Sequence, residues 1–207
     1  MLEATQAILN HYAYYDCLSI CRQLQGTLQR VSKVEIHLFA YLSCLLSLYE
    51  QQPVSGWGYS FAITEHPYPN SPALDEAMEV LAKKGSLLAD GDYLTVTDVG
   101  NKELTLLSAF SINSRREPYL YGACSSILAL PVGIISEAIS QEPDIKGAIT
   151  LSQSRLLLRD SGLNLLHEQF AELSKDIGVD VEDLMVPAIV WLSYLSSVRN
   201  QTEEKTL

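Results

Sequence analysis

The sequence predicts a mainly α-helical fold with a small β-hairpin wing, and three observations lead to that prediction. Residues 34–49 have the length of a helix and are apolar around most of its circumference. The segment from Ser71 to Gly85 carries the start and stop signals of another helix. An Asp-Gly pair at 90–91 then separates two short β-prone runs, which is a strong hairpin signal.

Two helices are predicted in the first 49 residues. Residues 4–29 place apolar side chains every three to four positions, the pattern of an amphipathic helix. Residues 34–49 are apolar on nearly every side, so we expect a buried helix that ends before Pro53. Residues 53–71 are rich in glycine and proline and indicate a structured loop with at most one short strand.

The capped helix and the hairpin together indicate a winged helix-turn-helix. Ser71 is predicted to cap a helix over residues 72–84, and Gly85 suits the left-handed position after its last turn. Residues 86–99 form the predicted hairpin, and a further helix start follows it. The order of buried helix, loop, capped helix, glycine and hairpin is that of a winged helix-turn-helix.

The rest of the chain is predicted to add helical extensions to this unit. Helices are expected over residues 102–113, 119–139, 152–158, 163–177 and 181–198, with one strand candidate at 147–151. The last two helices are expected to pack as a hairpin. The predicted division is an N-terminal helix (1–32), a winged-helix domain (33–107), a helical C-terminal region (108–200) and a flexible tail (201–207).

Charge and composition limit the classes of partner. Lysine and arginine number 14 against 25 aspartates and glutamates, which gives a formal net charge of −11. Such a charge repels phosphate backbones, so direct nucleic-acid binding is not expected. The longest uncharged run, 118–136, contains glycine, proline and tyrosine and indicates a buried or interface helix rather than a membrane span. With no recognisable leader, we expect a cytoplasmic location.

No catalytic motif is recognised, and neither a cofactor nor a metal is expected. The chain lacks a nucleophile elbow, a P-loop, a dinucleotide fingerprint and a zinc-protease motif. The four cysteines are interpreted as reduced core thiols, although Cys17 and Cys21 stand four apart on one helix face, where a metal or redox pair is the alternative. His37 is interpreted as a hydrogen-bonded core histidine. An enzyme with an unrecognised site is the least favoured hypothesis.

A partner-binding face is predicted on the capped helix, the preceding loop and the wing. In a DNA-reading winged helix, the second helix enters the major groove and basic residues flank it. Here that helix presents acidic residues before any lysine, so a protein partner is favoured over DNA. Simple solvation of the acidic residues is the alternative. The predicted partner-binding residues are Trp57, Tyr59, Phe61, Asp75, Glu76, Glu79 and Tyr93.

The segment from Leu74 to Gly100, with its glycine after the helix, its wing and its Thr97-x-x-Gly100 ending, resembles bacterial winged-helix accessory subunits. It is similar to the middle components that accompany ABC or SMC-like ATPases in defence operons, and more distantly to kleisin-associated winged-helix proteins. The resemblance implies a non-catalytic adaptor that joins an ATPase to an effector in anti-phage or anti-plasmid defence, often as a homodimer. A tandem version would need a second wing, which residues 108–200 do not show. The alternative function is a winged-helix transcription regulator that binds DNA as a dimer.

Overall fold

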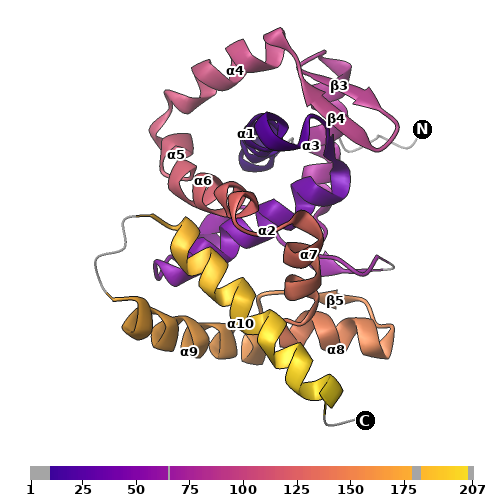
Figure 1. Ribbon diagram of the computed structural model, residues 1–207. Coiled ribbons are helices and arrows are strands. Elements are labelled where there is room, and N and C mark those ends of the chain that lie inside the picture. Colours follow the sequence, from indigo (N-terminus) through magenta and orange to yellow (C-terminus); the bar gives the residue numbers. More distant parts are fainter. Residues whose placement is uncertain (1–9, 65, 179–182, 205–207) are drawn as a thin grey trace, which may run out of the picture.

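The computed structural model describes residues 10–64, 66–178 and 183–204, and it is mainly helical with little β-structure, as predicted (Figure 1). The first half contains α1 (His11–Leu28), β1 (Val31–Ser32), α2 (Lys33–Tyr49), η1 (Val54–Trp57), β2 (Ala62–Ile63), α3 (Pro72–Lys83), β3 (Leu87–Asp90) and β4 (Tyr93–Val96). The second half contains α4 (Asp98–Ser108), α5 (Ser111–Ser114), α6 (Glu117–Ser125), η2 (Ser126–Leu128), α7 (Val132–Ser140), α8 (Pro143–Leu151), β5 (Arg155–Leu156), α9 (Asp160–Ile177) and α10 (Met185–Glu204).

The predicted hairpin forms the larger part of a three-stranded antiparallel sheet with the order β1-β4-β3. In the β3–β4 pair Leu87 lies opposite Val96 and Asp90 opposite Tyr93. Gly91 takes a φ of 61° in the two-residue loop, a conformation that glycine adopts at little cost. The order α1-β1-α2-α3-β3-β4 is compatible with a winged helix-turn-helix, and that assignment stays a prediction.

Helix α1 packs against the elements of the predicted winged unit. It contacts α2, α3, β1 and β4, so the expected boundary at residue 32 falls between elements that touch one another. Asn10 caps α1, since its Oδ1 accepts hydrogen bonds from the backbone N–H groups of Tyr12 and Ala13, each at 3.1 Å. The predicted helix was to begin at residue 4, and residues 1–9 lie outside the described part of the chain.

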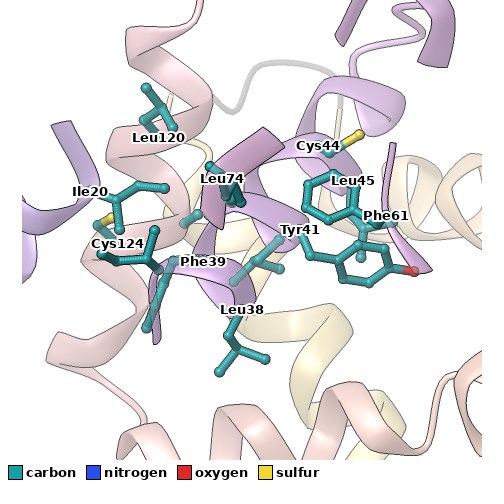
Figure 2. Packing of buried hydrophobic residues seen from close by; sticks show 14 of the residues in the cluster. Ile20, Leu38, Phe39, Tyr41, Cys44, Leu45, Phe61, Leu74, Leu120 and Cys124 are labelled. Atoms are coloured by element: carbon teal, nitrogen blue, oxygen red, sulfur yellow. The ribbon is translucent and has the colours of Figure 1, made fainter. Parts of the chain in front are cut away.

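Helix α2 forms the centre of the molecule, which confirms the prediction of a buried helix. Every residue from Ile36 to Leu48 is buried. A capping box starts the helix: Ser32 accepts a hydrogen bond from the Glu35 backbone N–H, and the Glu35 carboxylate accepts one from the Ser32 N–H. Figure 2 shows side chains from α1, α2, α3 and α6 meeting in this core.

The single helix predicted over residues 119–139 is wrong, because the chain bends sharply within it. Helix α6 continues into η2 and ends, and α7 starts after Pro131. Proline lacks the N–H that a continuous helix needs and disfavours helical geometry in the residue before it. Across the described residues, no single helix is long and apolar enough to cross a membrane, although the pair Ser111–Leu128 and Val132–Ser140, bent by 115°, passes the same test together.

Two further predictions in the second half are wrong. The strand candidate at 147–151 lies inside α8, whose start at Pro143 is capped by the Glu142 side chain. The helix expected over 152–158 is replaced by β5, which pairs antiparallel with β2. A strand of two residues depends on a partner nearly a hundred positions earlier, so local periodicity does not indicate it.

Helices α9 and α10 pack against each other, as predicted (Figure 1). The rings of Phe170 and Trp191 have centroids 5.8 Å apart at this contact. Helix α10 also contacts α6 and α7, so it joins the C-terminal helices to the central ones. It continues through Glu204, into the segment predicted to be a flexible tail; residues 205–207 lie outside the described part.

Candidate protein-interaction site

Helix α3 is amphipathic, and its outer side carries the predicted acidic residues. Its inner side buries four residues, which are Leu74, Ala77, Met78 and Leu81. On the other side Asp75 and Glu79 have side chains that are 57% and 70% exposed, and Glu76 is half-buried. Their carboxylates are therefore available to a partner.

A buried histidine fixes the start of α3. His37 accepts a hydrogen bond at Nδ1 from the Ser71 backbone N–H at 3.2 Å, so its Nε2 carries the proton and donates to Asp75 Oδ1 at 3.0 Å. This confirms the interpretation of His37 as a hydrogen-bonded core residue. The prediction that the Ser71 side chain caps α3 is wrong, because its Oγ is buried and makes no hydrogen bond.

Tyr68 lies near the start of α3, where its ring neighbours His37, the hydrogen-bond partner of Asp75. Burial raises the pKa of Tyr68, and the nearby carboxylates of Asp75 and Asp92 raise it further. An acid of the helix and an acid of the wing therefore both act electrostatically on Tyr68. We define the α3–wing face as Asp75, Glu76, Glu79 and Asp92.

Cations near this face are already paired with carboxylates. Four ion pairs hold them, namely Arg30–Asp90 at 3.0 Å, Lys33–Asp92 at 3.5 Å, Lys83–Glu79 at 3.2 Å and Lys84–Glu103 at 4.0 Å. They account for Lys83 and Lys84 at the end of α3 and for Arg30 and Lys33 beside the wing. The helix and wing thus present no unpaired positive stripe to a phosphate backbone.

Tyr93 is exposed, as the predicted site requires, but it lies on the outer side of the sheet. Its side chain alternates with the buried Leu94 and shares a sheet face with Leu88, which is 63% exposed. The guanidinium of Arg30 lies 4.8 Å from the centre of the Tyr93 ring. Tyr93 is 45% exposed, so the pair leaves part of the ring open to a partner.

The three loop aromatics do not form the exposed cluster that the prediction placed beside the wing. Trp57 is 3% and Phe61 1% exposed, and Tyr59 is half-buried. Phe61 packs edge-on against Tyr41 with ring centroids 5.3 Å apart. The alternating aromatic residues of this loop pack toward the core. They are therefore not exposed anchors for a partner.

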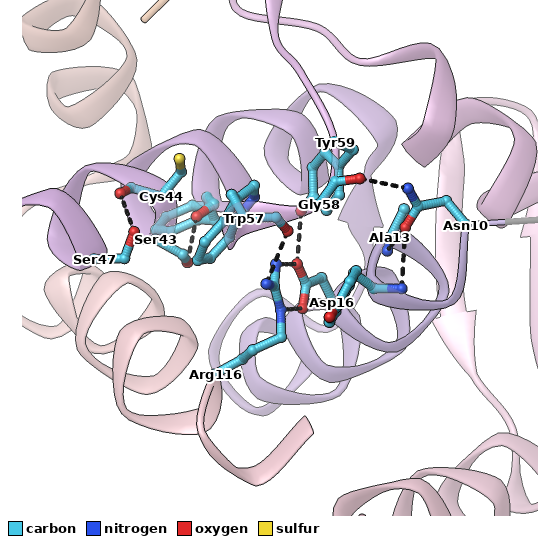
Figure 3. Close-up of polar contacts among 12 residues, drawn as sticks. Asn10, Ala13, Asp16, Ser43, Cys44, Ser47, Trp57, Gly58, Tyr59 and Arg116 are labelled. Atoms are coloured by element: carbon cyan, nitrogen blue, oxygen red, sulfur yellow. Dashed lines mark hydrogen bonds and ion pairs between the residues drawn. The ribbon is translucent and has the colours of Figure 1, made fainter. Parts of the chain in front are cut away.

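A buried ion pair that sequence reasoning missed holds this loop in place (Figure 3). Arg116 donates to both carboxylate oxygens of Asp16, and its Nη1 donates to the Trp57 carbonyl oxygen at 2.9 Å. The Tyr59 hydroxyl donates to the same carboxylate at 2.7 Å. Burial works to lower the pKa of Arg116, but the Asp16 carboxylate outweighs it and raises the pKa.

The four cysteines are free and buried, which agrees with their interpretation as core thiols. Burial raises the pKa of Cys17 well above its usual value and that of Cys21 to about 12, so both remain thiols at neutral pH. Within the described residues, no group of three or more His, Cys, Asp or Glu side chains is arranged to hold a metal ion.

Comparison of the chain with protein-family models, curated proteins and solved structures gave no match. The resemblance to accessory subunits of ATPase systems is therefore neither supported nor contradicted, and it stays a prediction.

Proposed function

We propose that the chain is a non-catalytic protein-interaction subunit that binds a basic surface of a protein partner through the α3–wing face. The observation that carries this proposal is that Lys83 and Lys84 at the end of α3, and Arg30 and Lys33 beside the wing, are all paired with carboxylates. Asp75 accepts a hydrogen bond from His37, and the Lys83–Glu79 contact is an exposed ion pair that competes weakly with a partner, so both carboxylates can still attract cations. Complementary charge of this kind sets specificity and association rate in protein complexes.

The same observation disfavours the alternative of a dimeric transcription regulator. Non-specific DNA affinity comes mainly from lysine and arginine that neutralise phosphates. A helix that leads with Asp75, Glu76 and Glu79 would instead bring carboxylates toward the phosphates. A winged-helix regulator places this helix in the major groove, so the helix could avoid the phosphates only by leaving that groove.

The partner class is proposed from the sequence resemblance alone. It implies an ABC or SMC-like ATPase or an effector subunit in a cytoplasmic defence complex, with self-association as a homodimer as a further contact. A basic docking surface on such a partner is what the acidic α3–wing face would fit.

The proposal is tested by affinity capture and DNA titration with the full chain. Tagged protein is recovered from its native host at moderate salt with nuclease added, and bound proteins are identified and quantified. We expect one protein in stoichiometric amount, and no mobility shift of duplex DNA that includes the promoter of the chain's own gene. A DNA shift that weakens steeply with salt, together with recovery of the chain alone, would establish the regulator instead.

A further inference from the structure

A groove runs between α9 and α10, on a different part of the molecule from the α3–wing face (Figure 1). Its volume is about 430 Å³. Its apolar lining consists of Leu165 and Leu173 from α9 and Val190, Trp191 and Tyr194 from α10. We call this feature the α9–α10 groove.

The groove has a buried aromatic floor and exposed apolar walls. Trp191 is only 2% exposed, and its Nε1 donates a hydrogen bond to Gln169 Oε1 at 3.4 Å, which fixes the position of the indole. By contrast, Leu165, Val190 and Tyr194 are 37%, 39% and 49% exposed. Apolar side chains that stay open around a fixed aromatic ring are the usual setting of an interaction anchor.

One edge of the groove is acidic. Glu168, Glu172 and Asp176 follow one another at intervals of four along α9, so they form a row about 12 Å long on one side of the helix. Glu172 pairs with Lys175 at 2.6 Å, an exposed contact that competes weakly with a partner. Within the described residues, Glu168 and Asp176 make no ion pair.

We infer that the α9–α10 groove binds an amphipathic helix of a protein partner, with its apolar stripe on Trp191 and its lysines or arginines along the acidic row. The groove spans about three turns of α9, so the partner helix needs apolar residues at positions i, i+3, i+4 and i+7. A second copy of this chain is disfavoured as the occupant, because two such grooves face to face would oppose their acidic rows. The site uses no residue of the α3–wing face, so either proposal can fail alone.

The probe for this inference is a synthetic helical peptide of about five turns with leucines at those positions and lysines along one flank. Its binding to the full chain is followed by fluorescence anisotropy of a label on the peptide. We expect saturable binding that weakens by about tenfold when Glu168→Gln and Asp176→Asn are combined. Tyr194→Ala should weaken it by a similar factor through lost apolar contact.

Matched variants separate the groove from general attraction to an acidic protein. Asp98→Asn removes an exposed charge from α4, and Leu106→Ala truncates a leucine there that is 70% exposed. Both should leave peptide affinity within about twofold of the wild type, and circular dichroism checks that every variant folds. If Asp98→Asn weakens binding as much as Glu168→Gln alone, or if a peptide with glutamates in place of lysines binds equally well, the inference is overturned.

Discussion

Arg116 and Asp16, one hundred positions apart in the sequence, form a buried two-point contact in which Arg116 Nε donates to Asp16 Oδ1 at 2.8 Å. Their side chains are only 6% and 0% exposed. The guanidinium also lies 3.8 Å from the centre of the Trp57 ring. The pair therefore joins α1, the loop after α2 and the start of α6 at one point.

Removing one partner of this pair should strongly destabilise the protein. Arg116→Met leaves the Asp16 carboxylate buried without its counter-ion, and such a change costs about 3–5 kcal/mol in the free energy of unfolding. Urea denaturation measures the loss. Adding Asp16→Asn to Arg116→Met should recover part of it, because the uncompensated charge is gone. A loss below about 1 kcal/mol for the single variant would show that the pair is not held as described.

Gly100 should not tolerate a side chain. A Cβ atom there would collide with the carbonyl oxygen of Ser86, which is fixed by hydrogen bonds from Thr97. We expect Gly100→Ala to lower the free energy of unfolding by about 1–3 kcal/mol. Gly26→Ala is the control, because a Cβ at that helical position meets nothing within 4 Å and should raise stability by about 0.5–1 kcal/mol. Equal effects of the two variants would contradict the packing at Gly100.

Glu142 should make stability depend on pH. Burial raises the pKa of this carboxyl from 4.5 to about 6 in the folded protein. The folded state therefore binds the Glu142 proton more tightly than the unfolded state does. This proton's contribution to the free energy of unfolding is fully present below pH 4.5 and is lost as pH rises through about 6. Relative to Glu142→Gln, the wild type should gain on the order of 1–2 kcal/mol in unfolding free energy as pH falls across that window. If the difference in unfolding free energy between the wild type and Glu142→Gln does not change with pH, Glu142 is not the source of the pH dependence.

His37 should matter more for stability than its exposed partner Asp75. His37→Leu leaves the buried Ser71 N–H without an acceptor, which costs about 1–3 kcal/mol. Asp75→Asn retains an oxygen for the His37 Nε2 proton and sits at an exposed position, so it should cost less than about 1 kcal/mol. Thermal unfolding of both variants gives the comparison. A larger loss of unfolding free energy for Asp75→Asn than for His37→Leu would contradict the importance given to the His37–Ser71 hydrogen bond.

Local signals were sufficient where the structure is local. The hairpin around Gly91, the buried α2 and the left-handed Gly85 all follow from turn chemistry and periodicity, and the structure has all three. Glu142 followed by Pro143 is also a local signal for a helix start, and α8 begins there in place of the strand predicted at 147–151. The apolar composition after residue 118 predicts one continuous helix, whereas the chain breaks at Pro131, where a new helix starts.

The site was less predictable because it depends on contacts between distant residues. Trp57 and Phe61 have the aromatic character of interface anchors, and only the packed structure shows that they are buried. One sequence feature indicated the Asp16–Arg116 pair, namely an aspartate on the apolar, buried side of α1. Its partner Arg116 lies one hundred positions later, so local spacing could not identify it. The acidity of α3 could be predicted from the sequence, whereas the pairing of the cations around it could not.

The central claim is tested most directly by repeating the affinity capture with the three α3 acids of the α3–wing face neutralised by Asp75→Asn, Glu76→Gln and Glu79→Gln. A control with three neutralised acids elsewhere, Glu50→Gln, Asp98→Asn and Asp183→Asn, changes the net charge equally. We predict that the control recovers the partner as the wild type does, while the α3 variant loses most of it. Equal recovery by both variants would contradict the proposal that this face binds the partner.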